Sequence, residues 1–198
     1  MKSGSRTLGV AFSDGDETSR LAGAVVRADG TLDGMGFEAC TVGGRDATIA
    51  VIRLFERLGR EDVQRVLCAG IAPAWFNLLD LRRIREAVER PTLAVSYEAS
   101  DGLAPALGDA FEGDALAERL ATYRSLPPRR RVRLDGERDG TEGDGGDDDE
   151  RPLYVRAIGM DDERAAELVR TLTREGFRRP EPVRVARIAA SAHRAAVE

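Results

Sequence analysis

The chain has 198 residues and a formal net charge of −5, and 42% of its residues are hydrophobic. This length favours a single domain, 1–198, because one core of this size buries roughly 70% of the surface that the unfolded chain exposes. No apolar run approaches the roughly 20 residues of a membrane span, and the apolar stretch near the N-terminus is shorter than a secretory signal core. These features exclude a transmembrane protein, and we expect a cytoplasmic one.

Cysteine and charge set further bounds. Cys40 and Cys68 are the only cysteines, too few for a disulfide framework or a four-cysteine metal centre, and we interpret both as small core residues. The segment 135–150 carries nine carboxylates and one arginine, so it contributes −8 and the rest of the chain sums to +3. Its glycine and aspartate content cannot bury apolar area, so we expect a disordered acidic loop insertion. The preference for arginine over lysine is typical of a salt-adapted source.

The first part of the chain predicts a mixed sheet. Alternating, β-prone residues with short connections predict an antiparallel meander of three strands at Thr7–Ser13, Leu21–Ala28 and Thr31–Val42. A helix that begins at Asp46 and ends at Gly59 follows. The apolar strands Val63–Ala69 and Thr92–Tyr97, each preceded by a helix, are typical of parallel strands that lie inside a sheet.

The second part of the chain adds helices and a late hairpin. We expect helices at Leu103–Phe111, at Ala115–Tyr123, from Asp161 onwards and at Pro182–Ala196, and a hairpin that pairs Val132–Leu134 with Leu153–Ile158. Three antiparallel strands followed by helix, strand, helix and strand is the order of a ribonuclease H-like α/β fold, a mixed sheet flanked by helices. Other α/β folds share this order, so it does not by itself fix the topology.

Several short strings along the chain carry a family resemblance. They are Leu8-Gly9-Val10, Gly44-Arg45-Asp46-Ala47-Thr48, Gly70-Ile71 with Phe76-Asn77 and Asp80, Leu153-Tyr154-Val155 with Gly159, and Pro180-Glu181-Pro182-Val183-Arg184-Val185-Ala186. In this order and spacing they resemble the archaeal deoxyuridine endonuclease family, formerly an uncharacterised domain family and related to endonuclease V. The chain looks like a divergent, salt-adapted member.

The resemblance implies a fold, a chemistry and a cofactor. The implied fold is ribonuclease H-like, as the order of elements predicts, and the implied activity is cleavage of DNA that contains deoxyuridine or deaminated bases, with DNA favoured over RNA as partner. Mg²⁺, held by carboxylates on the first strand and on the strand after the first helix, would activate water and neutralise phosphate charge.

The sequence departs from the family at the carboxylates themselves. In the family pattern an acidic pair follows Leu8-Gly9-Val10 and an aspartate precedes Gly70, but this chain has Ala11-Phe12 and Ala69. Two interpretations are open. Either the catalytic site is rebuilt from Asp14, Asp46 and Asp80, with Asp14 and Asp46 as metal ligands, or it is silent. Placing Asp14 at the catalytic position would require a β-bulge after Val10.

Two loops are candidate nucleic-acid contacts. Gly43-Gly44 precedes a helix, whose unpaired N–H groups attract phosphate, whereas Asp46 itself is better explained as a plain N-cap than as a metal ligand or phosphate contact. Trp75, Phe76 and Asn77 follow an inner strand, so we expect them at the carboxyl edge of the sheet, where aromatic rings stack on bases and an amide pairs with a base edge. The alternative is that the aromatic rings anchor the loop and Asn77 caps the next helix.

Arginine clusters are the remaining candidates. Arg129, Arg130 and Arg131, with Arg119 nearby, are candidates for binding a nucleic-acid backbone. A solvated face, or a partner for the acidic loop, explains them as well. The last helix carries a second basic stripe of Arg184, Arg187 and Arg194, which ordinary surface arginine also explains.

Three function hypotheses follow, and the sequence leaves the oligomeric state open. The first is a Mg²⁺-dependent endonuclease. The second is a catalytically silent nucleic-acid-binding protein on the same fold. The third is an interaction protein whose acidic loop shields the arginine face until a partner displaces it.

Overall fold

The computed structural model describes residues 4–98, 102–134 and 153–198. The segment 135–150, for which the sequence predicts a disordered acidic insertion, lies outside the described residues. The strands are β1 (Arg6–Asp14), β2 (Thr18–Arg27), β3 (Leu32–Thr41), β4 (Val63–Ala69), β5 (Thr92–Ser96), β6 (Arg130–Val132) and β7 (Leu153–Ile158). The helices are α1 (Ala47–Leu58), α2 (Pro73–Phe76), α3 (Leu81–Val88), α4 (Ala104–Ala110), α5 (Gly113–Ser125), α6 (Asp162–Leu172) and α7 (Glu181–Val197).

Within the described residues the strands form one mixed sheet in the order β3-β2-β1-β4-β5-β7-β6. β1, β2 and β3 pair antiparallel, and β4 and β5 continue the sheet parallel to β1. β7 pairs antiparallel with β5, and β6 with β7. The predicted arrangement of three antiparallel strands followed by parallel strands is therefore confirmed. A late antiparallel pair forms the edge as predicted, but its first strand is Arg130–Val132 and not Val132–Leu134.

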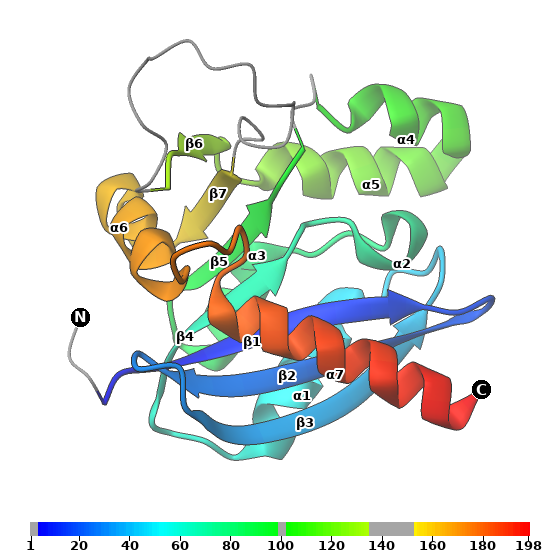
Figure 1. Cartoon of the computed structure of the whole chain (residues 1–198). Helices are drawn as coiled ribbons and strands as arrows, with labels where there is room; N and C mark the ends of the chain where they lie inside the picture. The colour runs from blue at the N-terminus through cyan, green and yellow to red at the C-terminus, as the bar shows by residue number, and fades with distance from the viewer. Residues whose placement is uncertain (1–3, 99–101, 135–152) are drawn as a thin grey trace, which may run out of the picture.

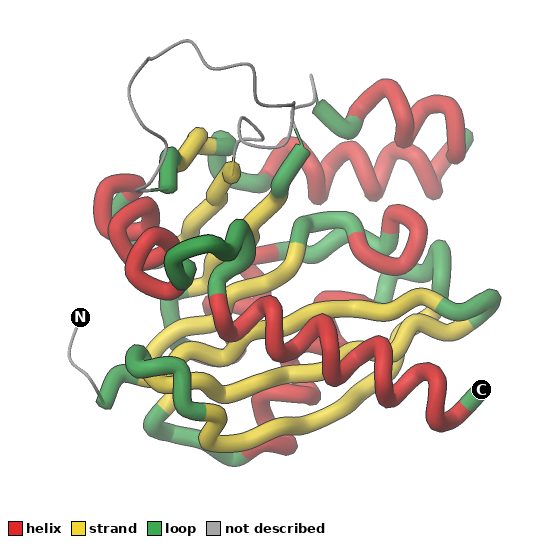
Figure 2. Tube along the Cα trace, viewed as in Figure 1, coloured by secondary structure: helices red, strands yellow, loops and turns green. Residues whose placement is uncertain are grey.

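Helices cover both faces of the sheet (Figures 1 and 2). On one face α1 and α3 pack on Leu8 and Val10 of β1 in the main core cluster. On the other face α7 packs on β1 and β2 through small residues such as Ala186, and α6 covers the β5–β7 end. Because successive side chains of a strand point to opposite faces, Ala11 of β1 faces α7 while Val10 faces α1.

The N-terminus of α7 lies directly against the backbone of β1. A Cβ atom built on Gly9 would lie 2.1 Å from both the carbonyl carbon and the carbonyl oxygen of Pro182. No side chain fits there, so glycine is required for this close approach. Two of the strings that carry the family resemblance, Leu8-Gly9-Val10 and the one that contains Pro182, thus meet in space.

A partly buried ion pair holds the same end of α7. Glu181, which is buried, accepts two hydrogen bonds from Arg184, at 2.7 and 2.8 Å, and lies 3.7 Å from Arg174. The hydrogen bonds from Arg184 hold the pKa of Glu181 below its usual value, although burial acts in the opposite direction. The start of α7 is therefore fixed by close backbone packing and by charge.

We predict that Gly9→Ala destabilises the protein by roughly 1–3 kcal/mol or more, because the added methyl group must displace the backbone of α7. The free energy of unfolding from urea titration measures this loss. Gly108→Ala in α4 is the matched control, since a Cβ atom at Gly108 meets no atom within 4 Å and alanine favours a helix. Equal stability of the two variants would contradict the proposed role of the Gly9 contact.

Candidate functional site

A cavity of about 470 Å³ opens at the carboxyl ends of β4 and β5, the edge of a parallel sheet where ligands commonly bind. Residues that line it include Gly70, Ile71, Phe76, Tyr123, Arg129 and Arg156. Its size falls within the range of roughly 300–1,000 Å³ that is usual for small-molecule sites. The cavity therefore combines aromatic walls with two guanidinium groups.

The two arginines of this cavity are held by backbone and by rings. Arg156 donates to the carbonyl oxygen of Pro127, and its burial lowers the pKa of its guanidinium. Arg129 donates to the carbonyl oxygen of Glu98 at 3.1 Å and stacks on Tyr154, 4.0 Å from the ring centroid. Such fixed, planar donors suit carbonyl or phosphate oxygens.

The segment α2, beside the cavity, has an unusual backbone. Ala74, Trp75 and Phe76 have φ values of 49°, 51° and 60°, in the left-handed region that residues with a Cβ rarely adopt. Such strain persists only where the surroundings enforce it. Here the N–H of Gly43 donates to the carbonyl of Ala74 at 2.7 Å, and Arg119 Nε donates to the carbonyl of Phe76 at 3.2 Å.

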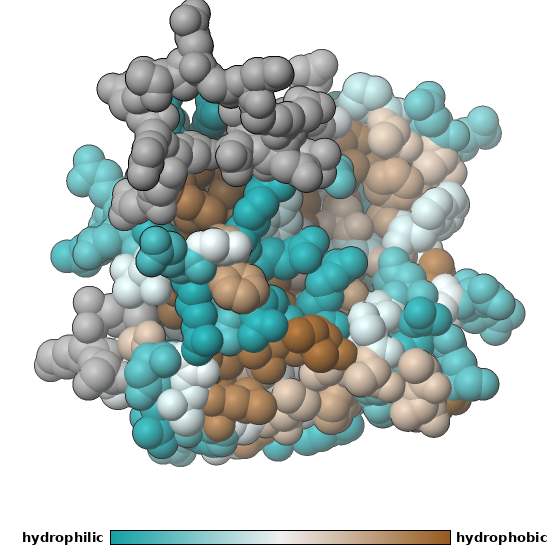
Figure 3. Space-filling model, viewed as in Figure 1, coloured by the Kyte–Doolittle hydropathy of each residue, from teal (hydrophilic) through white to brown (hydrophobic). Residues whose placement is uncertain are grey.

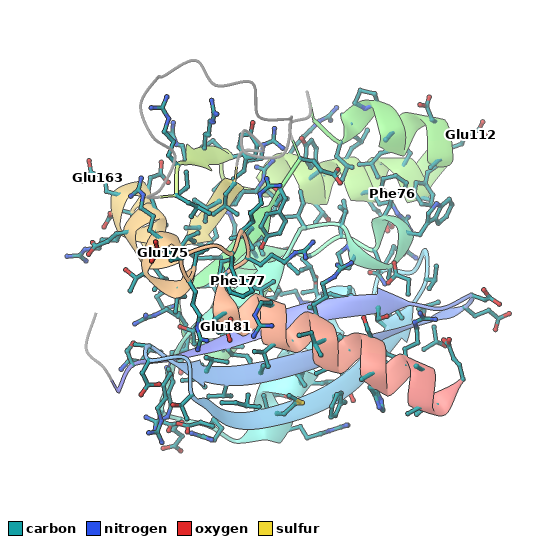
Figure 4. All side chains as sticks on the ribbon, viewed as in Figure 1. Phe76, Glu112, Glu163, Glu175, Phe177 and Glu181 are labelled. Atoms are coloured by element: carbon teal, nitrogen blue, oxygen red, sulfur yellow. The ribbon has the colours of Figure 1, made fainter. Side chains whose placement is uncertain are left out.

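The strained segment presents an aromatic surface. Trp75 is 54% exposed, and its ring lies 5.1 Å from Phe111 and 5.9 Å from Phe76, measured between centroids. Figure 4 shows Phe76 between α2 and the α4–α5 pair. The prediction that Trp75 and Phe76 lie at the carboxyl edge of the sheet is confirmed, and the exposure of Trp75 leaves its ring available for stacking.

Arg119 differs from the surface arginine that the sequence suggests. It is 5% exposed and donates to the carbonyl oxygens of Phe76, Gly43 and Gly44, the last two at 2.6 and 3.1 Å. Its guanidinium also lies 3.8 Å from the ring centroid of Phe111. Burial lowers its pKa. Arg119 therefore ties the Gly43-Gly44 loop to the strained segment.

Asn77 is buried completely and joins three segments. Its Nδ2 donates to the carbonyl of Thr41 at 2.8 Å and to Asp46 Oδ1 at 2.7 Å, and its Oδ1 accepts from the N–H of Ala47 at 3.0 Å. It thus caps α1, the preceding helix. The expectation that Asn77 caps the next helix is wrong: Asp80 caps α3, accepting from the N–H groups of Arg82 and Arg83.

Asp46 stands at the N-cap position of α1 but makes no capping hydrogen bond with its side chain. Its carboxylate turns back and accepts from the N–H and Oγ1 of Thr41 and from Asn77. Burial acts to raise the pKa of Asp46, but these hydrogen bonds outweigh it and hold the pKa below its usual value. Asp46 therefore occupies the predicted N-cap position, but its side chain binds Thr41 and Asn77 and not the N–H groups of the first turn of α1.

Asp14 and Asp46 lie at the same end of the meander. Asp14, exposed at the end of β1, accepts from Ser19 Oγ at 2.6 Å. Burial, together with the charges of Asp46 and Asp14, raises the pKa of the Cys40 thiol to about 12. Asp80, in contrast, is engaged at the start of α3.

The donor set does not fit a preassembled Mg²⁺ site in the part of the chain that the structure describes. Over residues 4–98, 102–134 and 153–198, no group of three or more His, Cys, Asp and Glu side chains could hold a metal ion. Ala11 lies instead in an apolar cluster with Ala24, Val26 and Ala186, and Ala69 packs against the same cluster.

Asp14 does not take the place of Ala11. β1 pairs with β2 residue by residue from Arg6 to Asp14, and the one register shift against β4 lies between Arg6 and Thr7. The bulge after Val10 that would bring Asp14 round is therefore not formed. By strand alternation Asp14 shares the face of Val10, opposite to the face of Ala11.

The arginine run is divided among several contacts. Arg130 pairs with Asp162 of α6 at 2.6 Å, and Arg131 is exposed on the edge strand β6. Arg129 alone of the three lines the cavity. The run therefore does not form one continuous basic face.

The sheet order, with α1 and α3 on one face and α7 on the other, defines a protein with the ribonuclease H-like fold. A solved protein of unknown function from Archaeoglobus fulgidus is similar, with a TM-score of 0.78 and 23% identity, over 96% of this chain and 98% of that one. Endonuclease V from Ciona intestinalis, solved with DNA that contains inosine, has a TM-score of 0.61 and 13% identity over 98% and 87% of the two chains.

The chain belongs to the endonuclease dU family, whose model matches residues 3–194. A UPF0215 protein of Thermococcus kodakarensis is 33% identical over 178 residues, which cover 89% of this chain and 82% of that protein. The family expectation drawn from the short sequence strings is thereby confirmed. Among the described residues, none of the helices has the length and apolar character needed to cross a membrane.

We predict that Asn77→Ala costs roughly 1–3 kcal/mol of stability, since it leaves buried partners unsatisfied. It also moves the pKa of Asp46 upward, because a hydrogen bond to the carboxylate is lost. A depressed carboxyl pKa stabilises the fold above the unfolded value of 3.8 and loses that contribution as pH falls through the folded value. Carboxyl NMR titration measures the shift, and an unchanged Asp46 titration would contradict this prediction.

Proposed function

We propose that this chain is a nuclease of the endonuclease dU family that acts on DNA containing deoxyuridine or another deaminated base. The observation that carries the proposal is the cavity at the ends of β4 and β5, with the exposed ring of Trp75 beside it. Enzymes that act on one base take it out of the stack and hold it in a pocket. Phe76 and Tyr123 supply flat walls for such a base.

The surrounding residues suit a single strand that leaves the duplex. An exposed aromatic ring stacks on any base face, so Trp75 is placed to hold a neighbouring nucleotide. Arg129 and Arg156 supply donors for base carbonyls, and Arg131 supplies charge for the backbone. The N–H groups of Gly43 and Gly44 donate to the carbonyl oxygens of Ala74 and Thr41, so the phosphate contact that the sequence predicts at this loop has no free donor and is not part of the proposal.

For the chemical step, Asp14 is the proposed catalytic residue. Its carboxylate is exposed and accepts a hydrogen bond from Ser19 Oγ, whereas Asp46 is engaged by Thr41 and Asn77 and Asp80 by the start of α3. Mg²⁺ is the cofactor that the family suggests. The described residues do not form a Mg²⁺ site in advance. The nicking assay below therefore tests whether cleavage requires Mg²⁺.

A second candidate function is binding without hydrolysis. The apolar cluster around Ala11 and Ala69 favours it, because family carboxylates are expected at these positions. A protein of this kind would keep the cavity and the Trp75 segment and bind a modified base without cutting the strand.

We predict that the protein nicks a labelled duplex with one deoxyuridine in the presence of Mg²⁺ or Mn²⁺, at low or at molar salt, and that Asp14→Ala abolishes nicking. Gel separation of the labelled strands measures cleavage. Asp16→Ala, which removes a neighbouring exposed carboxylate of the same turn, is the matched control and retains activity. If the folded protein does not nick the duplex at either salt concentration, the nuclease proposal is wrong and binding without hydrolysis takes its place.

We predict that a single-stranded oligonucleotide with one deoxyuridine quenches the fluorescence of Trp75, the only tryptophan of the chain. Trp75→Ala should weaken binding about tenfold, since stacking on one base contributes roughly 1–3 kcal/mol. Fluorescence anisotropy of a labelled oligonucleotide measures the affinity. Leu32→Ala, another exposed large side chain, on β3, should leave the affinity unchanged. Binding without quenching would place the strand away from Trp75.

A further inference from the structure

A cationic cluster lies on the face opposite to the cavity, around Tyr97. Tyr97 directly follows β5 and packs, with Ala69, against the core beneath α6. Its chain neighbours Ser96 and Glu98 line the cavity, whereas Tyr97 does not. The guanidinium of Arg179 lies 5.3 Å from the centroid of the Tyr97 ring. Tyr97 therefore belongs to a second site at the same sheet edge.

The hydroxyl of Tyr97 has an unmet hydrogen bond. Its oxygen is buried and has no partner among the described residues. Buried hydroxyls are normally hydrogen-bonded, so an orphaned one needs an explanation. Burial raises the pKa of Tyr97 even though Arg179, Arg178 and Arg187 act in the opposite direction, so the hydroxyl keeps its proton and offers a donor. An acceptor is the missing partner.

The charges around this hydroxyl are all positive. The charged groups that act on it are Arg179 and Arg178 of the α6–α7 connection and Arg187 of α7. Arg179 and Arg187 are exposed and form no ion pair with a described carboxylate, while Arg184 and Arg194 on the same helix pair with Glu181 and Glu198. In the space-filling view, hydrophilic side chains surround this connection (Figure 3).

This cluster borders the two alanines that replace the expected carboxylates. Arg187 follows Ala186, which packs on Ala11, and Tyr97 shares a core cluster with Ala69. A place expected to hold negative charge for a cation is therefore bordered by positive charge and a hydroxyl donor. Arginine forks match phosphate oxygens in geometry and in charge.

We propose that Arg179, Arg187 and the hydroxyl of Tyr97 bind a phosphate of the nucleic-acid strand directly. The inference rests on the proposed function only in taking nucleic acid as the source of the phosphate. A phosphate oxygen supplies the acceptor that Tyr97 lacks, and its charge compensates the two arginines. With the base held in the cavity on the Ser96 side of the β5 end, this site places a neighbouring phosphate on the Tyr97 side.

The first test compares Arg179→Gln and Arg187→Gln with Arg53→Gln, which removes one exposed charge from α1 on the opposite face of the sheet. Affinity for a labelled single-stranded oligonucleotide is measured by anisotropy over a range of salt. Each of the first two variants should bind about tenfold more weakly and lower the salt slope by about 0.7. Arg53→Gln should change neither. Equal losses in all three variants would overturn the site.

Tyr97→Phe tests the hydroxyl while it retains the packed ring. We expect about fivefold weaker oligonucleotide binding, as for the loss of one hydrogen bond. Inorganic phosphate should raise the Tm of the wild type and not that of Tyr97→Phe or Arg179→Gln. If the wild type binds no oligonucleotide, the proposed function fails. The Tm measurement with inorganic phosphate then tests the phosphate site by itself. If phosphate then raises the Tm of the wild type but not that of the variants, the site binds phosphate from a ligand other than nucleic acid. If phosphate does not raise the Tm of the wild type, the site is overturned.

Discussion

The close packing of α7 on the backbone of β1 is the contact on which the Tyr97 side of the candidate site depends. Because Gly9 has no side chain, the carbonyl of Pro182 reaches the strand, and the partly buried Glu181–Arg184 pair fixes the first turn of the helix. That position places Ala186 on Ala11. Any outward movement of α7 would expose this cluster and separate Arg187 from Tyr97.

On the other face the site depends on polar ties rather than on apolar packing. The left-handed backbone of Ala74, Trp75 and Phe76 is costly, at roughly 1–3 kcal/mol for each residue. Hydrogen bonds offset that cost: the N–H of Gly43 donates to the carbonyl oxygen of Ala74, and Arg119 donates to that of Phe76. The exposed ring of Trp75 is thus presented by a rigid segment, which lowers the entropy cost of stacking on a base.

The strands and helices could be predicted because their signals are local. Alternation identifies β1 to β3, and apolar runs after helices identify β4 and β5. The ties within the site could not be predicted in the same way. Ala-Trp-Phe carries no glycine to signal left-handed backbone, Asn77 caps a helix that precedes it by thirty positions, and Arg119 reads as a surface charge. The Tyr97 cluster forms only when β5, the α6–α7 connection and α7 meet.

Alanine at positions 11 and 69, where the family resemblance implies carboxylates, changes what this sheet edge can hold. A carboxylate at position 11 or 69 would add negative charge beside the Tyr97 cluster, which includes Arg179 and Arg187. With alanine at both positions, the arginines keep their charge for an external anion. The buried Tyr97 hydroxyl lacks a hydrogen-bond acceptor, which an anion would also supply. Alanine at these two positions and the proposed direct phosphate contact are therefore mutually consistent, whether or not the proposed catalytic role of Asp14 on the opposite face holds.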